Sequence, residues 1–218
     1  MSDTLISPKG TVLTHVATMK TTLEKDDAAK RISVTRVFKI MLDPGHGDHN
    51  DENSMVDPGA VAKHDGKTYK EKDMALQFAK AVGKVLAGKG HTVVYTRESD
   101  IDNKELEKLQ WRVDMAEEQK VDAFVSIHLD AAVGKSSGLS VYANSKADAI
   151  KKSVEESVKA IDVRHPKSKS LHVLRENKDR AAILIEAGFI TNSVDQKIVE
   201  GAELSIEVAT GIDAGLRK

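Results

Sequence analysis

Two histidines and two glutamates, far apart along the chain, are the residues with the clearest capacity for chemistry. His46 follows a predicted apolar strand, His128 and Glu186 close two others, and Glu71 opens a predicted helix. In an open α/β sheet the strand ends line up along one edge, and ligands bind just outside that edge. We therefore expect these side chains to gather at one edge of a sheet.

The chemistry that such a group would support is metal-assisted hydrolysis. Two imidazoles and one carboxylate, with a water in the fourth position, form the ligand set of a catalytic zinc site. A further carboxylate nearby would serve as the general base for that water. Spacing along the chain does not show that these side chains meet, and it leaves open which carboxylate takes which role.

The elements before His46 and around Glu71 are the best defined. Val37–Leu42 is a short apolar run that suits a buried strand, and it stops at DPGHG, where proline and glycine force a turn. His46 therefore lies on a tight loop at the mouth of a strand. Glu71–Leu86 has apolar residues at three- and four-residue spacing, which predicts an amphipathic helix. Glu71 lies in the first turn, where negative charge suits the helix dipole.

The rest of the chain alternates strands with helices, apart from a long polar connection over residues 48–70. Connections of that length in compact domains are typically functional or mobile. The alternation predicts an α/β fold, a mostly parallel twisted sheet with helices on both faces. The other predicted strands are His91–Arg97, Val121–Leu129, Gly138–Ala143, an edge strand at Leu171–Leu174, and Ala181–Glu186, and the other predicted helices are Asn103–Gln119, Ala147–Ile161, Val194–Glu200 and Ala202–Leu216.

The composition excludes several classes of protein. The chain has 33 Lys and Arg against 34 Asp and Glu, so no net basic field exists to bind nucleic acid. It has no cysteine, which excludes a disulfide scaffold and a thiolate metal site. No apolar run approaches the ~20 residues of a membrane span, and no signal peptide is visible at the N-terminus. We expect a chain that is made in the cytoplasm, with no membrane span and no nucleic-acid partner.

The chain is predicted to hold a single catalytic domain over residues 37–218, preceded by an N-terminal extension over residues 1–36 whose role is open. In the extension, Thr11–Met19 and Arg31–Val37 have the β-branched content of strands. Lys20–Lys30 between them is charged and is expected to be a short helix or a loop.

Four segments of the chain resemble, in the same order, the motifs of the zinc-dependent N-acetylmuramoyl-L-alanine amidases, which cleave peptidoglycan. Four ordered motifs are far more specific than any one of them, and the resemblance extends over residues 37–218. The segments are LDPGHG at Leu42–Gly47, EKDMAL at Glu71–Leu76, SIHLD at Ser126–Asp130, and LHVLRE with AAILIEAGFITN between Leu171 and Asn192.

The resemblance implies that His46, Glu71 and His128 bind Zn²⁺ and that Glu186 is the catalytic glutamate. It implies hydrolysis of the amide bond between N-acetylmuramic acid and L-alanine, with peptidoglycan as the partner and wall lysis as the outcome. The chain departs from the family at LD, residues 129–130, where a small residue and asparagine usually follow the third ligand. This departure concerns the local loop contacts, not the ligand.

The N-terminus also bears on where the enzyme acts. Neither a signal peptide nor a separate wall-binding module is visible, which resembles the phage endolysins that reach the wall when cells lyse. We expect a monomer that acts on the cell wall after release at lysis.

Two alternative functions stay open. A zinc peptidase could cut within the peptidoglycan stem peptide, and only the amidase would free intact stem peptides from the sugar. A wall-binding or regulatory module that has lost catalysis is the other alternative. The presence of Glu186 together with all three presumed ligands counts against the second alternative, and lysis that chelation abolishes and zinc restores would exclude it.

Overall fold

The chain divides into two compact units, Met1–Val37 and Phe38–Lys218, which are described separately. The computed structural model describes residues 20–22, 33–50, 55–101, 109–167 and 169–218. In the first unit, β1 (Lys20–Thr22) pairs antiparallel with β2 (Ser33–Thr35).

This hairpin confirms one expectation for the extension and corrects another. Strand β2 lies inside the strand predicted at Arg31–Val37, whereas β1 replaces the start of the helix or loop predicted at Lys20–Lys30. The three residues of β1, KTT, include two β-branched threonines, which favour a strand. The strand predicted at Thr11–Met19 lies outside the described residues, and the assignment of residues 1–36 to an N-terminal extension stays a prediction.

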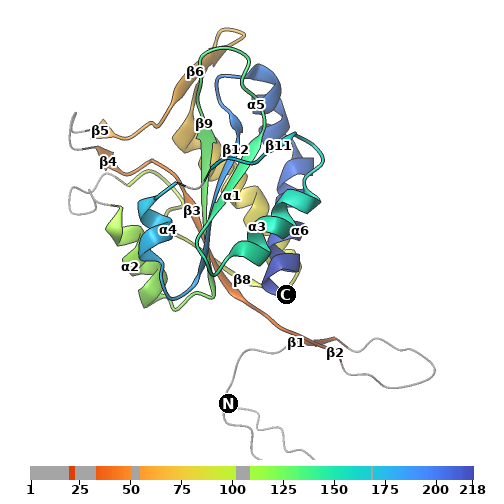
Figure 1. Cartoon of the computed structure of the whole chain (residues 1–218). Coiled ribbons are helices and arrows are strands. Elements are labelled where there is room, and N and C mark those ends of the chain that lie inside the picture. The colour runs from red at the N-terminus through yellow and green to blue at the C-terminus, as the bar shows by residue number, and fades with distance from the viewer. Residues whose placement is uncertain (1–19, 23–32, 51–54, 102–108, 168) are drawn as a thin grey trace, which may run out of the picture. The chain divides into compact units, whose positions relative to one another are not determined.

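Six strands of the second unit form one sheet in the order β11-β10-β12-β9-β3-β8 (Figure 1). Neighbouring strands from β12 to β8 are parallel, while β10 is antiparallel to β12 and parallel to β11. The mostly parallel α/β sheet predicted from the sequence is confirmed. The strands are β3 (Lys39–Pro44), β8 (Thr92–Tyr95), β9 (Ala123–Asp130), β10 (Leu139–Ala143), β11 (Val163–Arg164) and β12 (Ala181–Phe189).

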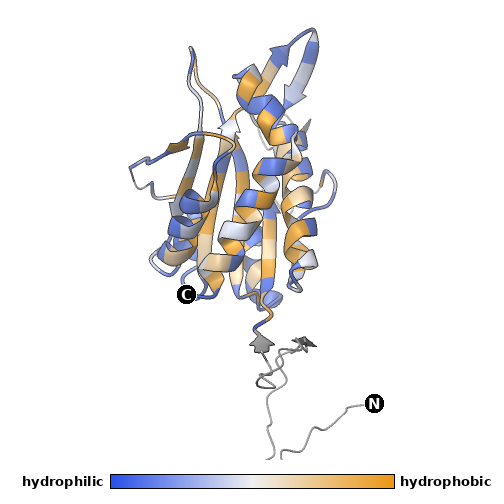
Figure 2. Cartoon of the chain, turned by 90° about the vertical axis from the view of Figure 1, so that its right-hand side faces the viewer, coloured by the Kyte–Doolittle hydropathy of each residue, from blue (hydrophilic) through white to orange (hydrophobic). Residues whose placement is uncertain are grey.

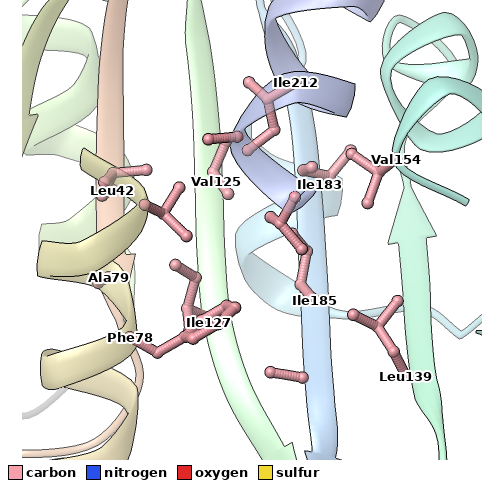
Figure 3. Packing of buried hydrophobic residues seen from close by; sticks show 14 of the residues in the cluster. Leu42, Phe78, Ala79, Val125, Ile127, Leu139, Val154, Ile183, Ile185 and Ile212 are labelled. Carbon is pink, nitrogen blue, oxygen red and sulfur yellow. The ribbon is translucent and has the colours of Figure 1, made fainter. Parts of the chain in front are cut away.

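Helices cover both faces of this sheet. Alternate residues of the central strands are therefore buried in two different apolar clusters, one on each face. Leu42 and Val125 pack in the cluster shown in Figure 3, and their neighbours Met41 and Phe124 pack in the other. Figure 2 shows that the strands are largely hydrophobic and that the helices carry residues of both kinds. The first cluster includes residues of α1 (Glu71–Gly88), α3 (Asp148–Ser157), α5 (Ser193–Glu200) and α6 (Ala202–Leu216), and the second includes residues of α2 (Gln110–Glu118) and α4 (His172–Glu176).

The predicted edge strand at Leu171–Leu174 is wrong, because this segment leads into helix α4. Its apolar residues resemble a strand in sequence, but the adjacent residues Val173 and Leu174 are both buried, which suits one turn of helix lying on the sheet. Strand β11 occupies that edge of the sheet instead.

The polar connection over residues 48–70 contains two hairpins that sequence reasoning missed. Strand β4 (His49–Asn50) pairs with β5 (Met55–Val56), and β6 (Val61–His64) pairs with β7 (Lys67–Lys70). Asp65 and Gly66, which join the second pair, both have positive φ, at 50° and 77°. An Asp-Gly pair with two positive φ angles is the turn that a two-residue hairpin favours.

Candidate metal centre

The carboxyl ends of three neighbouring parallel strands bring together residues that are distant in sequence. Pro44 at the end of β3 is in register with Ile127 of β9, and His128 of β9 is in register with Glu186 of β12. The side chains of His128 and Glu186 therefore point to the same face at the same level. His46 lies two residues beyond β3, so it reaches the same edge.

The structure places the donor atoms of His46, Glu71 and His128 around one point. Oε1 of Glu71 lies 3.0 Å from Nε2 of His46 and 3.0 Å from Nδ1 of His128. One donor atom from each of the three residues lies within 4.8 Å of the others, and the two imidazole rings meet edge to face with their centroids 5.0 Å apart. Glu71 is the first residue of α1, so the helix start aims its carboxylate at the two rings.

This arrangement fits a metal ion. Two imidazole nitrogens and one carboxylate oxygen lie close together, as the three donor atoms around a metal ion do. The backbone N–H of Leu129 donates to the same Oε1 at 3.1 Å, which further fixes the carboxylate. Gly45 lets the ring of His128 lie close to the loop that carries His46, because a Cβ at Gly45 would lie 2.3 Å from Cε1 of His128.

Electrostatics within the triad favour the charged forms of His46 and Glu71. Burial lowers the pKa of His46, but hydrogen bonds to Asp57 and Glu71 outweigh burial and raise that pKa from 6.5 to about 9. Burial raises the pKa of Glu71, but hydrogen bonds from His128 and His46 hold it well below its usual range. A carboxylate that stays ionised at all working pH values is suited to a cation.

Glu186 lies beside the triad and has a different environment. It lines a cavity of about 260 Å³ together with His46 and His128. Its Oε2 is buried and has no hydrogen-bond partner within the described part of the chain. Burial raises the pKa of Glu186 to about 7, and the nearby His128 only partly opposes this. A carboxyl group with a pKa near neutral can both accept and release a proton at neutral pH.

The loop that carries His46 is held by two buried arginines that sequence reasoning missed. Arg97 donates to the carbonyl oxygens of Pro44 at 3.0 Å and Gly45 at 2.8 Å. Arg112 donates to the carbonyl oxygens of Pro44 and His46, each at 3.0 Å. His46 itself has a φ of 58°, a conformation that is uncommon for residues other than glycine. The hydrogen bonds from the two arginines hold the loop in this conformation.

The carboxylates of Asp43 and Asp48 balance the charge of Arg112, which is 1% exposed. Hydroxyl groups of Thr96 and Ser126 also donate to Asp43, at 2.8 and 2.7 Å. The sequence does offer one signal for this network, because Arg112 stands between two apolar residues, Trp111 and Val113, both of which are buried. An arginine at such a position needs a buried acidic partner.

The raised pKa of Glu186 predicts how the stability of chelator-treated protein depends on pH. The pKa of Glu186 in the folded protein, about 7, lies above its ordinary value of 4.5, so the native state binds the proton more tightly than the unfolded chain. The free energy of unfolding therefore falls as pH rises from about 4.5 to about 7, by about 3 kcal/mol. Urea titrations of wild type and Glu186→Gln at pH 4.5, 6 and 8 should show a stability difference that grows over this window. A difference independent of pH would contradict the assignment.

A model of the N-acetylmuramoyl-L-alanine amidase family, Amidase_3, matches residues 40–218. The chain is 44% identical over 110 residues to the amidase AmiC of Escherichia coli, a match that covers 50% of this chain and 23% of that protein. It is 29% identical over 194 residues to the germination-specific N-acetylmuramoyl-L-alanine amidase of Bacillus subtilis, which covers 81% of this chain and 77% of that one. The chain thus spans about a quarter of the first relative and most of the second.

Solved structures agree with these matches. The amidase AmiC2 of Nostoc punctiforme superposes with a TM-score of 0.66 at 28% identity, covering 83% of this chain and 95% of that chain. The catalytic domain of the amidase CwlV from Paenibacillus polymyxa gives the same TM-score and identity, with coverages of 82% and 96%. The family match spans most of the chain, and the sheet and helices are those of amidase structures. The chain therefore belongs to the N-acetylmuramoyl-L-alanine amidase family.

Proposed function

We propose that this chain is a zinc-dependent peptidoglycan hydrolase that cleaves the amide bond between N-acetylmuramic acid and L-alanine. The observation that carries the proposal is the convergence of His46, Glu71 and His128 on one point, with Glu186 in the same cavity. Family membership supports the substrate and the bond, and the geometry supports the type of catalysis.

His46 would bind zinc through Nε2, His128 through Nδ1, and Glu71 through Oε1, because these are the atoms that face one another. The ion, when bound, supplies a Lewis acid that activates water and polarises the scissile carbonyl. Two neutral nitrogen ligands and one carboxylate leave a net positive charge at the site, which favours both effects.

Glu186 would move the proton that the reaction requires. Hydrolysis joins the oxygen of water to the lactyl carbonyl carbon and breaks the bond from that carbon to the nitrogen of L-alanine. Glu186 accepts a proton from the attacking water and delivers it to the departing amine, so the carboxylate is regenerated in each cycle. Among the described residues the buried Oε2 has no hydrogen-bond partner, so it can make this contact, and a pKa of about 7 suits both steps.

The decisive experiment is the analysis of reaction products. Purified protein loaded with zinc is incubated with peptidoglycan, and the soluble products are identified by mass spectrometry. We expect intact stem peptides with a free L-alanine amine, produced by the zinc-loaded protein, lost after chelation and restored by added zinc. Products cut inside the stem peptide would establish a peptidase instead. Binding to the wall without any released product would establish a non-catalytic module.

The place of action is the cell wall under this proposal. In the part of the chain that the structure describes, no helix has both the length and the apolar character needed to cross a bilayer. Release at cell lysis, as for the phage endolysins, stays a prediction, and so does the monomeric state.

A further inference from the structure

The turn formed by residues 57–60 contacts two of the three proposed zinc ligands. Oδ2 of Asp57 lies 2.6 Å from Nδ1 of His46, the ring nitrogen that faces away from Glu71. At the other end of the turn, the backbone N–H of Ala60 donates to Oε2 of Glu71 at 2.9 Å. The turn therefore contacts Nδ1 of His46 and Oε2 of Glu71, the polar atoms of these two side chains that would not bind zinc.

Backbone hydrogen bonds hold Asp57 in place. Its Oδ1 accepts from the N–H of Gly59 at 2.9 Å, which leaves Oδ2 for the imidazole. Its backbone carbonyl accepts from the N–H of Gly47 at 2.9 Å, and its own N–H donates to the carbonyl of Asp48 at 2.7 Å. The turn is therefore joined directly to the loop that carries His46.

Gly59 brings the turn into close contact with both ligands. Its φ is +62°, and a Cβ at this position would lie 2.6 Å from Cδ2 of His46 and 2.7 Å from Oε2 of Glu71. The turn thus leaves no room for either ligand to swing towards it. A side chain at Gly59 would displace both.

A carboxylate on one nitrogen of an imidazole determines what the other nitrogen can do. An ionised Asp57 can only accept, so Nδ1 of His46 is the donor, and a ring that gives up its other hydrogen to bind a cation carries its lone pair on Nε2, the nitrogen that faces Glu71. Such a carboxylate also fixes the ring plane and increases the basicity of the metal-binding nitrogen.

From these contacts we infer that Asp57 is a positioning residue for the metal site, acting through His46, and that the N–H of Ala60 does the same for Glu71. This inference rests on the proposed function, because it assigns the turn a role towards the proposed zinc ion. Asp57 does not touch the substrate in this role, so its loss acts first on the affinity for zinc.

The test compares the zinc affinity of Asp57→Ala, Asp57→Asn and wild type by competition with a chromogenic chelator. Loss of an outer carboxylate typically weakens metal binding about 10- to 100-fold. We expect a loss in that range for Asp57→Ala and a smaller one for Asp57→Asn, since asparagine retains an acceptor oxygen. Asp65→Asn is the matched control, because Asp65 lies in the β6–β7 turn at a positive φ that asparagine tolerates. It should bind zinc as wild type does.

A second measurement separates positioning from general loss of structure. The ¹⁵N and ¹H chemical shifts of the Nδ1–H group of His46 in the zinc-loaded protein report the hydrogen bond from this group, and they should differ between wild type and Asp57→Ala. Folded Asp57→Ala protein with wild-type zinc affinity and unchanged Nδ1–H shifts would overturn the inference and leave the proposed function standing. A wild-type protein that binds no zinc would overturn both.

Discussion

Replacing Glu186 with glutamine is expected to lower the kcat for muropeptide hydrolysis by about 10²- to 10⁴-fold, the range for loss of a positioned acid–base group. Glutamine keeps the shape of the side chain but cannot accept a proton from water. Because Glu186 is not one of the three convergent donors, the variant should bind zinc with the stoichiometry of wild type. The KM should change much less than kcat, since the lost contact serves the transition state.

Asp130 offers a matched control for this experiment. It lies two residues beyond His128 at the end of β9, and its negative charge is one of the influences that raise the pKa of Glu186. Its Oδ1 accepts a hydrogen bond from the N–H of Ala131. Asp130→Asn removes one negative charge from the same region without removing the proposed base, so its kcat should stay within a few-fold of wild type. Wild-type turnover by Glu186→Gln would exclude Glu186 as the base.

The part of the site that the sequence predicts is the part that the strand order dictates. Parallel strands end at one edge of a sheet, so residues that close apolar strands converge there however far apart they are in sequence. His128 and Glu186 meet in this way, through the register of β9 and β12. The position of His46 follows from a second signal, the turn that DPGHG forces after the strand. The position of Glu71 follows from the predicted start of a helix.

The parts that sequence reasoning missed depend on hydrogen-bond partners, which periodicity does not reveal. Asp57 was one of several acidic residues in a polar connection, and nothing local distinguishes it as the partner of His46. Arg97 and Arg112 contact backbone carbonyl oxygens of the His46 loop, and these contacts depend on tertiary structure alone. Helix α4 was mistaken for a strand because a five-residue element is too short to display a helical period.

Replacing His128 with alanine is expected to have the opposite signature to Glu186→Gln, because it should empty the site of zinc. The change removes Nδ1, one of three convergent donors, and leaves His46 and Glu71 alone. Loss of an outer carboxylate costs about 10- to 100-fold in metal affinity, so loss of a direct ligand should cost at least about 100-fold. Hydrolysis should fall with occupancy and recover in part at high zinc concentration.

Elemental mass spectrometry measures the zinc content of the purified protein, and competition with a chelator measures its zinc affinity. His165→Ala is the control, because the His165 side chain is 74% exposed and lies outside the triad. It should retain zinc and activity. His128→Ala protein that holds zinc as tightly as wild type but does not turn over would show that His128 acts on the substrate rather than on the metal. The Glu186→Gln variant should keep its zinc but lose proton transfer. Comparing the two variants therefore separates zinc binding by His128 from proton transfer by Glu186.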